Sequence, residues 1–445
     1  MEREYFRDGI WAFRINDESF YFNCVDMTYL QAEELPSASS NYESVKTLSA
    51  KEHTFVFEPK QFIERTQETQ PNIYIDILSD CYLKLPFQIT NAVLFLTEAC
   101  NLKCRYCYYL SDASEKSRLE NKISFMTFDL AEDVLRFLLQ NSSSEEPQLC
   151  FFGGEPLLNF RLMKKIIDTG EQYKKEYKKH IHYSITTNGT LLTPEIVAFL
   201  EENNVDVTIS IDGDELLQNK IRPFKDGKSS YSTTIANLCH LSKFNIRSTI
   251  TRYNTDLEHL TELFKNYPVQ RLYFRTALKP RDKDLALEEQ HLSQVVSSLK
   301  RISKKKVSGQ PGYDSIIRGY FMNQFAKINK KPTSPVPCGF LNSNITVGTD
   351  GSIYPCHALV GNQRYIIGHI KEGLNSRKMQ DLLVTFFNCR NRYCVGCPIL
   401  NICLGGCFYE NFDLDGTCEG PKAILCEFRK EVFKIALYLF SHKAF

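Results

Sequence analysis

The chain of 445 residues is long for a single hydrophobic core, so we expect two or three domains. Its 54 Lys and Arg residues nearly balance its 53 Asp and Glu residues, and this balance gives no indication of a nucleic-acid partner or an anionic membrane surface. The first residues carry both signs of charge without an apolar run, and no later run is long enough to span a bilayer, so we expect a cytoplasmic protein.

Sixteen cysteines are the most informative feature of the composition. Because cytoplasmic thiols are kept reduced, this number favours metal or cluster ligation over a disulfide framework. Three cysteines lie within residues 100–107, and nine lie between Cys338 and Cys426. Four others are isolated and are expected to be buried as small hydrophobic residues, namely Cys24, Cys81, Cys150 and Cys239.

Residues 1–85 predict a small α+β appendage. Gly9–Asn16 and Ser19–Asp26 have the pattern of two strands around a short turn. A helix is expected near Tyr29–Leu35 and a further strand at His53–Glu58.

From Asn91 to about residue 278 the pattern alternates between strands and helices. Apolar or alternating runs predict six strands, at Ala92–Leu96, Leu149–Phe152, Tyr183–Thr187, Val205–Ile211, Ile246–Thr251 and Arg271–Phe274. Helical spacing after the strands predicts helices at Phe128–Gln140, Leu162–Tyr173, Pro194–Asn203, Ser232–Phe244 and Leu257–Asn266. This order predicts a parallel sheet with helices outside, and it leaves open whether the sheet closes.

Three cysteines follow the first of these strands at the spacing C-x3-C-x2-C, with Tyr106 directly before the third; they are Cys100, Cys104 and Cys107. Thiolates bind zinc and iron–sulfur clusters. A structural zinc ion takes four ligands, whereas three thiolates on a four-iron cluster leave one iron free. The spacing resembles that of the radical SAM enzymes, in which S-adenosylmethionine (SAM) binds the free iron. A zinc site, or scattered buried cysteines, is the alternative.

The resemblance to radical SAM enzymes implies an α/β fold with an open, partial (β/α)6 TIM-type barrel. Active sites of parallel barrels lie at the carboxyl ends of the strands, where the cysteine loop is expected. Gly153, Gly154 and Glu155 follow the second strand and match the family motif that meets the amino group of SAM. Two glycines allow a ligand to approach the backbone closely, although Gly-Gly-Glu-Pro alone is only a turn signal.

Four further residues are counted with the SAM contacts: Tyr106, directly before the third cysteine, and three residues at the ends of the third and fourth strands or just beyond. The resemblance assigns Ser210 to the ribose or amino acid part of SAM and Arg222 to its carboxylate, which suits a planar guanidinium. Asn188 follows the third strand. Each of these last three has a structural alternative, because Asn-Gly is a common turn pair and polar side chains often cap strand ends.

The C-terminal cysteines resemble the SPASM signature of radical SAM enzymes that carry two auxiliary [4Fe–4S] clusters. With the barrel motifs, the resemblance covers residues 91 to about 435. It implies that the first auxiliary cluster is held by Cys338, Cys356 and Cys407. It implies that the second is held by Cys394, Cys397, Cys403 and Cys426. The first cluster is one ligand short, so either Cys389 or Cys418 completes it, or one iron stays open for a substrate thiolate, which we favour. A structural role for both cysteines is the alternative.

The run Tyr354-Pro-Cys-His357 separates two subfamilies. Sulfatase maturases carry a catalytic aspartate directly after the cysteine, where this chain has His357. The run through Gly361-Asn362 resembles maturases that cross-link ribosomally made peptides, especially those that form cysteine thioethers. The resemblance makes His357 a candidate proton acceptor or a group beside the cluster. A structural histidine is the alternative.

Together these resemblances imply an oxygen-sensitive radical SAM maturase. A deoxyadenosyl radical made from SAM would take a hydrogen from a ribosomally synthesised precursor peptide, and a cross-link, most directly a Cys thioether, would follow. An electron donor of the flavodoxin or ferredoxin type is implied, with three [4Fe–4S] clusters in all. Rival activities are formylglycine formation in a sulfatase, and carbon–carbon cross-linking or epimerisation of a peptide. The non-enzymatic alternative is a zinc-stabilised binding module.

The expected domains follow from these patterns. Residues 1–85 form the appendage, where related maturases bind a leader peptide, and residues 86–280 form the barrel. A Lys-rich bridging segment spans 281–337, and the cysteine-rich SPASM domain spans 338–445.

Overall fold

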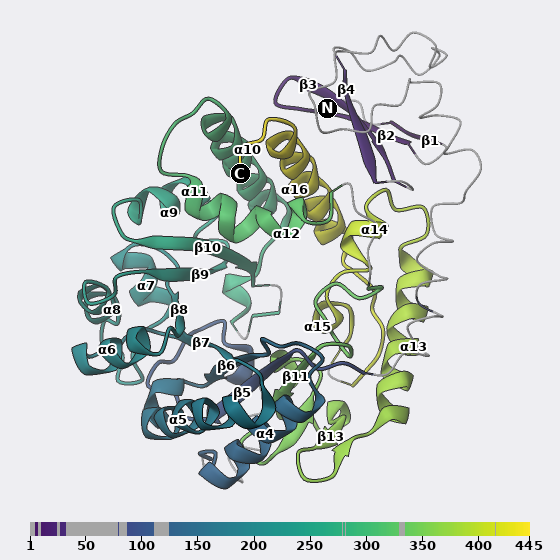
Figure 1. The fold of residues 1–445 in the computed structure, drawn as a ribbon. Helices are drawn as coiled ribbons and strands as arrows, with labels where there is room; N and C mark the ends of the chain where they lie inside the picture. Colours follow the sequence, from purple (N-terminus) through teal and green to yellow (C-terminus); the bar gives the residue numbers. More distant parts are fainter. Residues whose placement is uncertain are drawn as a thin grey trace.

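A computed structural model gives the arrangement of the 445-residue chain (Figure 1). It describes residues 5–7, 10–24, 27–32, 79, 87–110, 124–277, 279–280, 282–328, 334–413 and 415–445. The predicted strand at His53–Glu58 and the predicted buried Cys81 lie outside the described residues.

Six parallel strands form the barrel wall. They are β5 (Asn91–Thr97), β6 (Gln148–Gly153), β7 (His182–Thr187), β8 (Asp206–Ser210), β9 (Phe244–Ile250) and β10 (Val269–Thr276). Each strand pairs with the next along the chain. In the described sheet β10 forms one edge, and β5 continues into C-terminal strands instead of meeting β10. The prediction of an open, partial (β/α)6 barrel is confirmed.

The five predicted barrel helices are present on the outside of the sheet (Figure 1). They are α4 (Phe128–Asn141), α5 (Phe160–Tyr177), α6 (Pro194–Glu202), α8 (Tyr231–Leu238) and α9 (Leu257–Leu263). Helix α8 ends earlier than predicted, because Phe244 already begins β9. A short helix that the sequence analysis did not predict, α7 (Glu215–Ile221), ends at Arg222 and so fixes the position of that residue.

The C-terminal region extends the barrel sheet. Strand β11 (Asn344–Val347) runs parallel to β5, and β12 (Ser352–Tyr354), β13 (Gly368–His369) and β14 (Gly373–Leu374) continue antiparallel. Four helices accompany these strands, α13 (Ser376–Tyr393), α14 (Leu400–Cys403), α15 (Phe408–Asn411) and α16 (Ala423–Ser441). The bridging segment contributes α10 (Glu289–Val307), α11 (Asp314–Ile316) and α12 (Met322–Phe325), and α10 packs on α16.

A separate antiparallel sheet lies at the N-terminus. It consists of β1 (Tyr5–Arg7), β2 (Ile10–Ile15), β3 (Glu18–Asn23) and β4 (Thr28–Ala32). The two predicted strands are confirmed as β2 and β3. The helix predicted at Tyr29–Leu35 is wrong over its first part, because β4 pairs with β3 along its whole length.

The N-terminal sheet packs on the last helix. The rings of Trp11 and Phe22 lie against the ring of Phe433 on α16, with centroids 6.2 and 4.8 Å away. The side-chain amide of Asn401 donates a hydrogen bond to the carbonyl oxygen of Cys24 at 2.7 Å. The two ends of the chain therefore share one apolar core. No helix in the described part of the chain has the length and apolar composition needed to cross a membrane.

Candidate active site

The loop that leaves β5 carries the first three cysteines. Cys100, Cys104 and Cys107 are half-buried, and the backbone N–H of Cys107 donates to the carbonyl oxygen of Cys104 at 3.2 Å. Burial raises the pKa of Cys104 to about 12; the positive charge of Arg222 opposes this, and the other two thiols add to it. The three thiols therefore lie close enough to interact electrostatically. Their arrangement agrees with the predicted set of ligands.

The donor set fits an iron–sulfur cluster. In the described ranges, no three His, Cys, Asp or Glu side chains converge closely enough to hold one metal ion. The three thiols come from one loop and interact electrostatically with one another. Soft ligands on one loop suit a cluster, in which each thiolate binds a different iron.

Gly153 and Gly154 bring the backbone of β6 against the cysteine loop. A Cβ atom on Gly154 would overlap the carbonyl oxygen of Ala99, and one on Gly153 would overlap that of Thr97. The N–H groups of Gly154 and Glu155 donate to these same carbonyls, Thr97 and Ala99, at 2.9 and 2.7 Å. The sequence analysis expected the glycines to admit a ligand, whereas their close contact is with the chain's own cysteine loop.

Glu155 is buried, and three groups of the chain donate hydrogen bonds to its carboxylate. Its carboxylate accepts hydrogen bonds from the N–H of Leu157 (3.1 Å), the hydroxyl of Thr187 (2.7 Å) and the N–H of Asn188 (2.8 Å). Burial raises the pKa of Glu155, and these hydrogen bonds oppose the increase. The carboxylate is therefore held in one orientation at the carboxyl end of the sheet.

Asn188 also contacts the cysteine loop. Its side-chain amide donates to the side-chain oxygen of Asn101 at 2.8 Å, and Asn101 donates in turn to the hydroxyl of Thr190 at 2.8 Å. The sequence analysis missed Asn101, which lies directly after Cys100 and links the loop to β7. Its position between two cysteines of the motif is the feature of the sequence that could have identified it.

Tyr106, Asp212 and Arg222 form a buried cluster beside the thiols. The hydroxyl of Tyr106 donates to Asp212 at 2.7 Å, and Arg222 donates to that hydroxyl and lies 3.9 Å from the Asp212 carboxylate. The Nε of Arg222 is buried and has no hydrogen-bond partner in the described chain. An unpartnered guanidinium donor beside the cluster thiols fits the carboxylate of SAM. Asp212, to which the sequence analysis gave no role, orients both partners.

Ser210 ends β8 and is half-buried. It pairs in register with Arg247 of β9. The structure therefore places Ser210 at the same end of the sheet as Glu155 and Asn188.

The cysteines predicted for the first auxiliary site come together from three segments. Burial raises the pKa of Cys407, and Glu410, Cys356 and Cys338 add to the increase. Burial likewise raises the pKa of Cys356 to about 11, with a contribution from Cys338. Each of the three thiols thus lies within electrostatic reach of the other two.

The cysteines predicted for the second auxiliary site line one cavity. The cavity has about 300 Å³ of empty volume, including the part that opens to solvent. Its wall includes all four predicted thiols, Cys394, Cys397, Cys403 and Cys426. Four thiols that line one shared cavity fit a [4Fe–4S] cluster.

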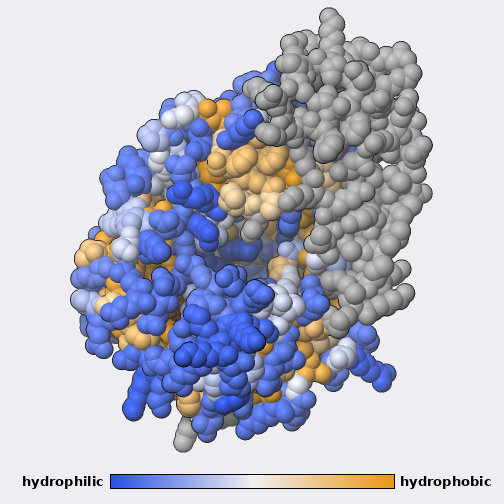
Figure 2. Space-filling view, viewed as in Figure 1, coloured by the Kyte–Doolittle hydropathy of each residue, from blue (hydrophilic) through white to orange (hydrophobic). Residues whose placement is uncertain are grey.

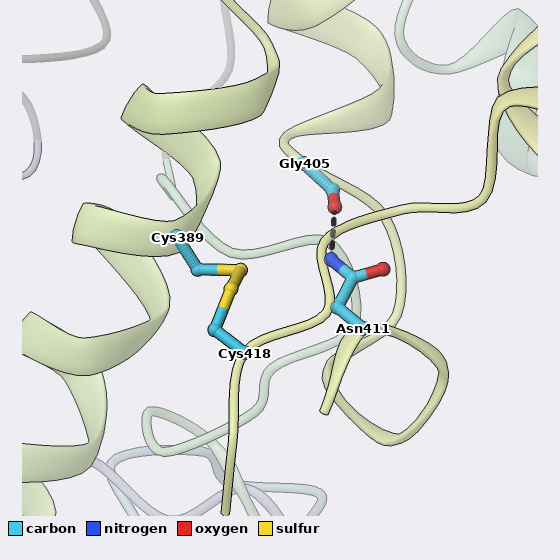
Figure 3. Close-up of a disulfide and its surroundings, with 4 residues drawn as sticks. All are labelled: Cys389, Gly405, Asn411 and Cys418. Carbon is cyan, nitrogen blue, oxygen red and sulfur yellow. Dashed lines mark hydrogen bonds between the residues drawn. A yellow bond between two sulfur atoms is a disulfide. The ribbon is translucent and has the colours of Figure 1, made fainter. Parts of the chain in front are cut away.

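Cys389 and Cys418 form a disulfide, with Cα atoms 6.2 Å apart (Figure 3). The expectation that the thiols are all reduced is wrong for this pair. The suggestion that one of them completes the first auxiliary site is also wrong, because each sulfur is already bonded to the other. The pair links α13 to the loop before α16. Beside it, the side-chain amide of Asn411 donates to the carbonyl oxygen of Gly405 at 2.7 Å (Figure 3).

The isolated cysteines differ in burial. Cys24 is 2% exposed, as predicted. Cys150 is half-buried and Cys239 is exposed, so the prediction of burial is wrong for Cys239. Cys239 directly follows α8, which ends earlier than its sequence pattern indicated.

His357 lies between the two predicted cluster sites. Its Nδ1 is 2.6 Å from the hydroxyl of Tyr108, which interacts electrostatically with both Cys107 and Cys356. Burial lowers the pKa of His357 to about 3, and Arg247 and Arg275 contribute. Burial also raises the pKa of Tyr108, so the tyrosine keeps its proton and donates to a neutral imidazole. Tyr108 escaped the sequence analysis, since an aromatic residue after a cysteine has many structural uses.

Comparison with known proteins agrees with this geometry. The pattern of the radical SAM superfamily matches residues 94–262. An uncharacterised protein of Methanocaldococcus jannaschii is 32% identical over 279 residues, covering 60% of this chain and 85% of that protein. A cysteine-type anaerobic sulfatase-maturating enzyme of Clostridium novyi is 25% identical over 358 residues, covering 75% and 91%. The radical SAM cyclopropyl synthase TigE of Paramaledivibacter caminithermalis is 27% identical over 384 residues, covering 78% and 76%.

Two solved structures share the fold. The structure of anSMEcpe with bound AdoMet and the Cp18Cys peptide is 21% identical, with a TM-score of 0.66, and covers 80% of this chain and 100% of that one. SuiB of Streptococcus suis bound to its precursor peptide SuiA is 13% identical, with a TM-score of 0.55, and covers 95% and 99%. From the superfamily match, the relatives and the cysteine loop at the ends of the barrel strands, the chain belongs to the radical SAM superfamily and is an enzyme.

Proposed function

We propose that this enzyme is a peptide maturase that installs a cross-link, most directly a thioether from a cysteine, in a ribosomally synthesised precursor peptide. The observation that carries the proposal is the gathering of three thiol sets, each at the positions expected for a cluster, around one open barrel. SuiB, with the same fold, was solved with a precursor peptide, which supports a peptide as substrate.

Membership of the superfamily implies SAM and a [4Fe–4S] cluster as cofactors. Cys100, Cys104 and Cys107 would hold the cluster, and Arg222 and Glu155 would position the amino acid part of SAM. When bound, these cofactors supply a deoxyadenosyl radical that removes a hydrogen atom from the substrate. The chain itself orients SAM through the Tyr106 cluster and shields the site by burial.

The number of thiols at the first auxiliary site supports thioether formation over other peptide modifications. It offers three thiols, and the disulfide removes Cys389 and Cys418 as further ligands. A fourth position would then remain for the thiolate of a substrate cysteine. His357 would lie beside that thiol, but its Nδ1 accepts from Tyr108 and burial holds its pKa near 3, so it would act as a neutral hydrogen-bonding neighbour and not as the base.

The remaining assignments extend this proposal. The N-terminal sheet, with β1 and β4 at its edges, would bind a leader peptide by strand addition. Residues 338–445 would form the SPASM domain, after the barrel of residues 86–280 and a bridging segment. A flavodoxin or ferredoxin would supply the electron.

Formylglycine formation is the second candidate, because a cysteine-type sulfatase-maturating enzyme matches 75% of the chain. The position that follows Cys356 is occupied by His357, where sulfatase maturases are expected to carry an aspartate. This difference favours the cross-linking maturase.

Anaerobic reconstitution and product analysis test the proposal. We expect about 12 irons per chain, four for each of three clusters. Co-expression with a cysteine-rich peptide encoded beside the gene, followed by mass spectrometry, should reveal a peptide that has lost two hydrogens and one alkylatable thiol. A product that has lost its sulfur would indicate formylglycine. A colourless protein that contains zinc would contradict both candidates.

A further inference from the structure

We propose that Arg247 and Arg275 form a carboxylate-binding site inside the barrel, which selects a peptide substrate with an acidic group next to the reacting residue. The proposal rests on the proposed function, since it names a property of the substrate of that site. The carboxylate would come from an Asp or Glu side chain or from the peptide C-terminus.

The two arginines share one face of the sheet. Arg247 on β9 pairs in register with Tyr273 of β10, and Arg275 pairs with Thr249, so the arginines are diagonal neighbours on adjacent strands. Side chains that are two positions apart along a strand point to the same face, and such diagonal neighbours lie within reach of each other. Ile246 and Phe274, which directly precede the two arginines and point to the opposite face, join the hydrophobic core.

That shared face is the inside of the barrel. Arg247 interacts electrostatically with Tyr106, Tyr108 and Cys150, which come from the cysteine loop and β6. Both arginines also interact with His357 and Cys356. The guanidinium groups therefore face the space between the cysteine loop and the first auxiliary site, where the substrate would react.

Neither arginine forms an ion pair with a carboxylate among the described residues. Two other arginines near the site each form one. Arg222 is paired with Asp212, and Arg429 with Glu410. Glu410 also lies within electrostatic reach of Arg275, but its carboxylate is already bonded to Arg429. Two like charges thus lie near each other without a carboxylate bonded to either of them among the described residues.

This arrangement is unfavourable until an anion binds. Burial lowers the pKa of Arg247, and the charge of Arg275 lowers it further. A carboxylate between the two guanidiniums would accept charge-assisted hydrogen bonds and relieve the repulsion. Solvent reaches the site, since Arg247 is half-buried and Arg275 is exposed. Figure 2 shows the molecule hollowed near the centre of this face, with hydrophilic residues below and to the left of the hollow and a hydrophobic patch above it.

The same charges would also offset the anionic sulfurs of the first auxiliary site, so the experiment must separate the two roles. Three synthetic cysteine peptides of one length serve as probes of the reconstituted full-length enzyme. One has an internal Asp and an amidated C-terminus, one has Asn and a free C-terminus, and one has Asn and an amidated C-terminus. Affinity is measured anaerobically by calorimetry in the presence of SAM, and iron content is measured on the same samples.

We expect one of the two acidic peptides to bind about tenfold more tightly than the neutral peptide, and the tighter one identifies the source of the carboxylate. Arg275→Gln and Arg247→Gln should abolish this preference and leave the affinity for the neutral peptide and the iron content unchanged. Arg377→Gln, at an exposed residue of α13 far from the barrel interior, is the matched control and should retain the preference.

Equal affinity of the wild-type enzyme for the three peptides would overturn the proposal. A loss of iron in the Gln variants, restored by Arg275→Lys and Arg247→Lys, with the acidic preference intact, would also overturn it and assign the charges to the auxiliary site. A preference for an acidic peptide without any cross-linked product would leave the binding site in place and contradict the proposed function instead.

Discussion

At the scale of residues, the site contains a few side chains whose orientation is fixed by several hydrogen bonds. Tyr106 is an example, because its hydroxyl lies between a buried carboxylate and a buried guanidinium. Glu155 is another, since hydrogen bonds from Leu157, Thr187 and Asn188 fix the orientation of its carboxylate. Groups held in this way would contact SAM at little reorganisation cost.

The most direct residue-scale prediction concerns Cys104. Cys104→Ala should abolish deoxyadenosine formation, because two thiolates do not hold the SAM-binding cluster, while about eight irons remain in the auxiliary sites. Anaerobic iron analysis and chromatography of SAM products measure both effects. Cys239→Ala, at an exposed free cysteine, is the control and should behave as wild type. Unchanged SAM cleavage in Cys104→Ala would contradict the assigned role.

At the scale of elements, two contacts between neighbouring segments can be tested by substitution. The first is the close approach of β6 to the cysteine loop at Gly154. The second is the ion-pair network between α9 and α10, in which Glu258 bonds to Arg301 and Lys305.

Gly154→Ala should displace the cysteine loop, because the added Cβ would overlap the backbone of Ala99. We expect the SAM-binding cluster to be lost, about four of 12 irons, with the helical circular dichroism retained. Gly227→Ala is the comparison: its positive φ of 84° also strains an alanine, but a Cβ atom there meets nothing within 4 Å, so it should keep its full iron content. Full iron content and SAM cleavage in Gly154→Ala would show that the loop tolerates the methyl group.

The Glu258 network predicts a pH dependence of stability. Burial acts to raise the pKa of Glu258, but hydrogen bonds from Lys305 and Arg301 outweigh it and lower the pKa below its usual 4.5. The unfolded chain therefore binds this proton at a higher pH than the folded protein does. The stabilisation is complete well above pH 4.5 and is lost as the pH falls through the lower pKa of the folded state.

Urea unfolding of Glu258→Gln measures this contribution. We expect the variant to be less stable than wild type by about 1 kcal/mol at pH 7, because the network is partly exposed to solvent. The difference should shrink as the pH falls below 4.5. A difference that stays constant down to pH 3 would assign the effect to packing instead of charge.

At the scale of the whole molecule, the C-terminal region contacts both the barrel and the N-terminal sheet. Strand β11 extends the barrel sheet at β5, and α16 packs against both α10 and the N-terminal sheet. The disulfide between Cys389 and Cys418 joins two parts of this region across 29 positions of sequence.

Replacing both cysteines of the disulfide by serine tests its role. The free energy of unfolding should fall by about 3 kcal/mol, because the unfolded chain regains the freedom of the closed loop. The iron content should stay at about 12 per chain, since neither sulfur is a cluster ligand. Wild type in reductant should show the same loss of stability. A loss of about four irons in this variant would show that one of the two cysteines is a cluster ligand in the wild-type protein.

The sequence by itself determined most of the barrel and the three thiol sets, because strand and helix periodicity and short ligand spacings are local signals. It predicted the strands β5 to β10 and their helices, and it named Cys100, Cys104 and Cys107. It missed Asn101 and Tyr108, whose partners are 89 and 249 positions away in the chain.

Tertiary structure decided what depends on distant segments meeting. Only the fold pairs Cys389 with Cys418, turns Tyr29 into part of a strand beside β3, and brings Arg247 and Arg275 together on adjacent strands. The physical reason is common to these cases. A local pattern fixes backbone conformation and ligand spacing, whereas pairing, charge compensation and burial are properties of neighbours that the chain acquires only by folding.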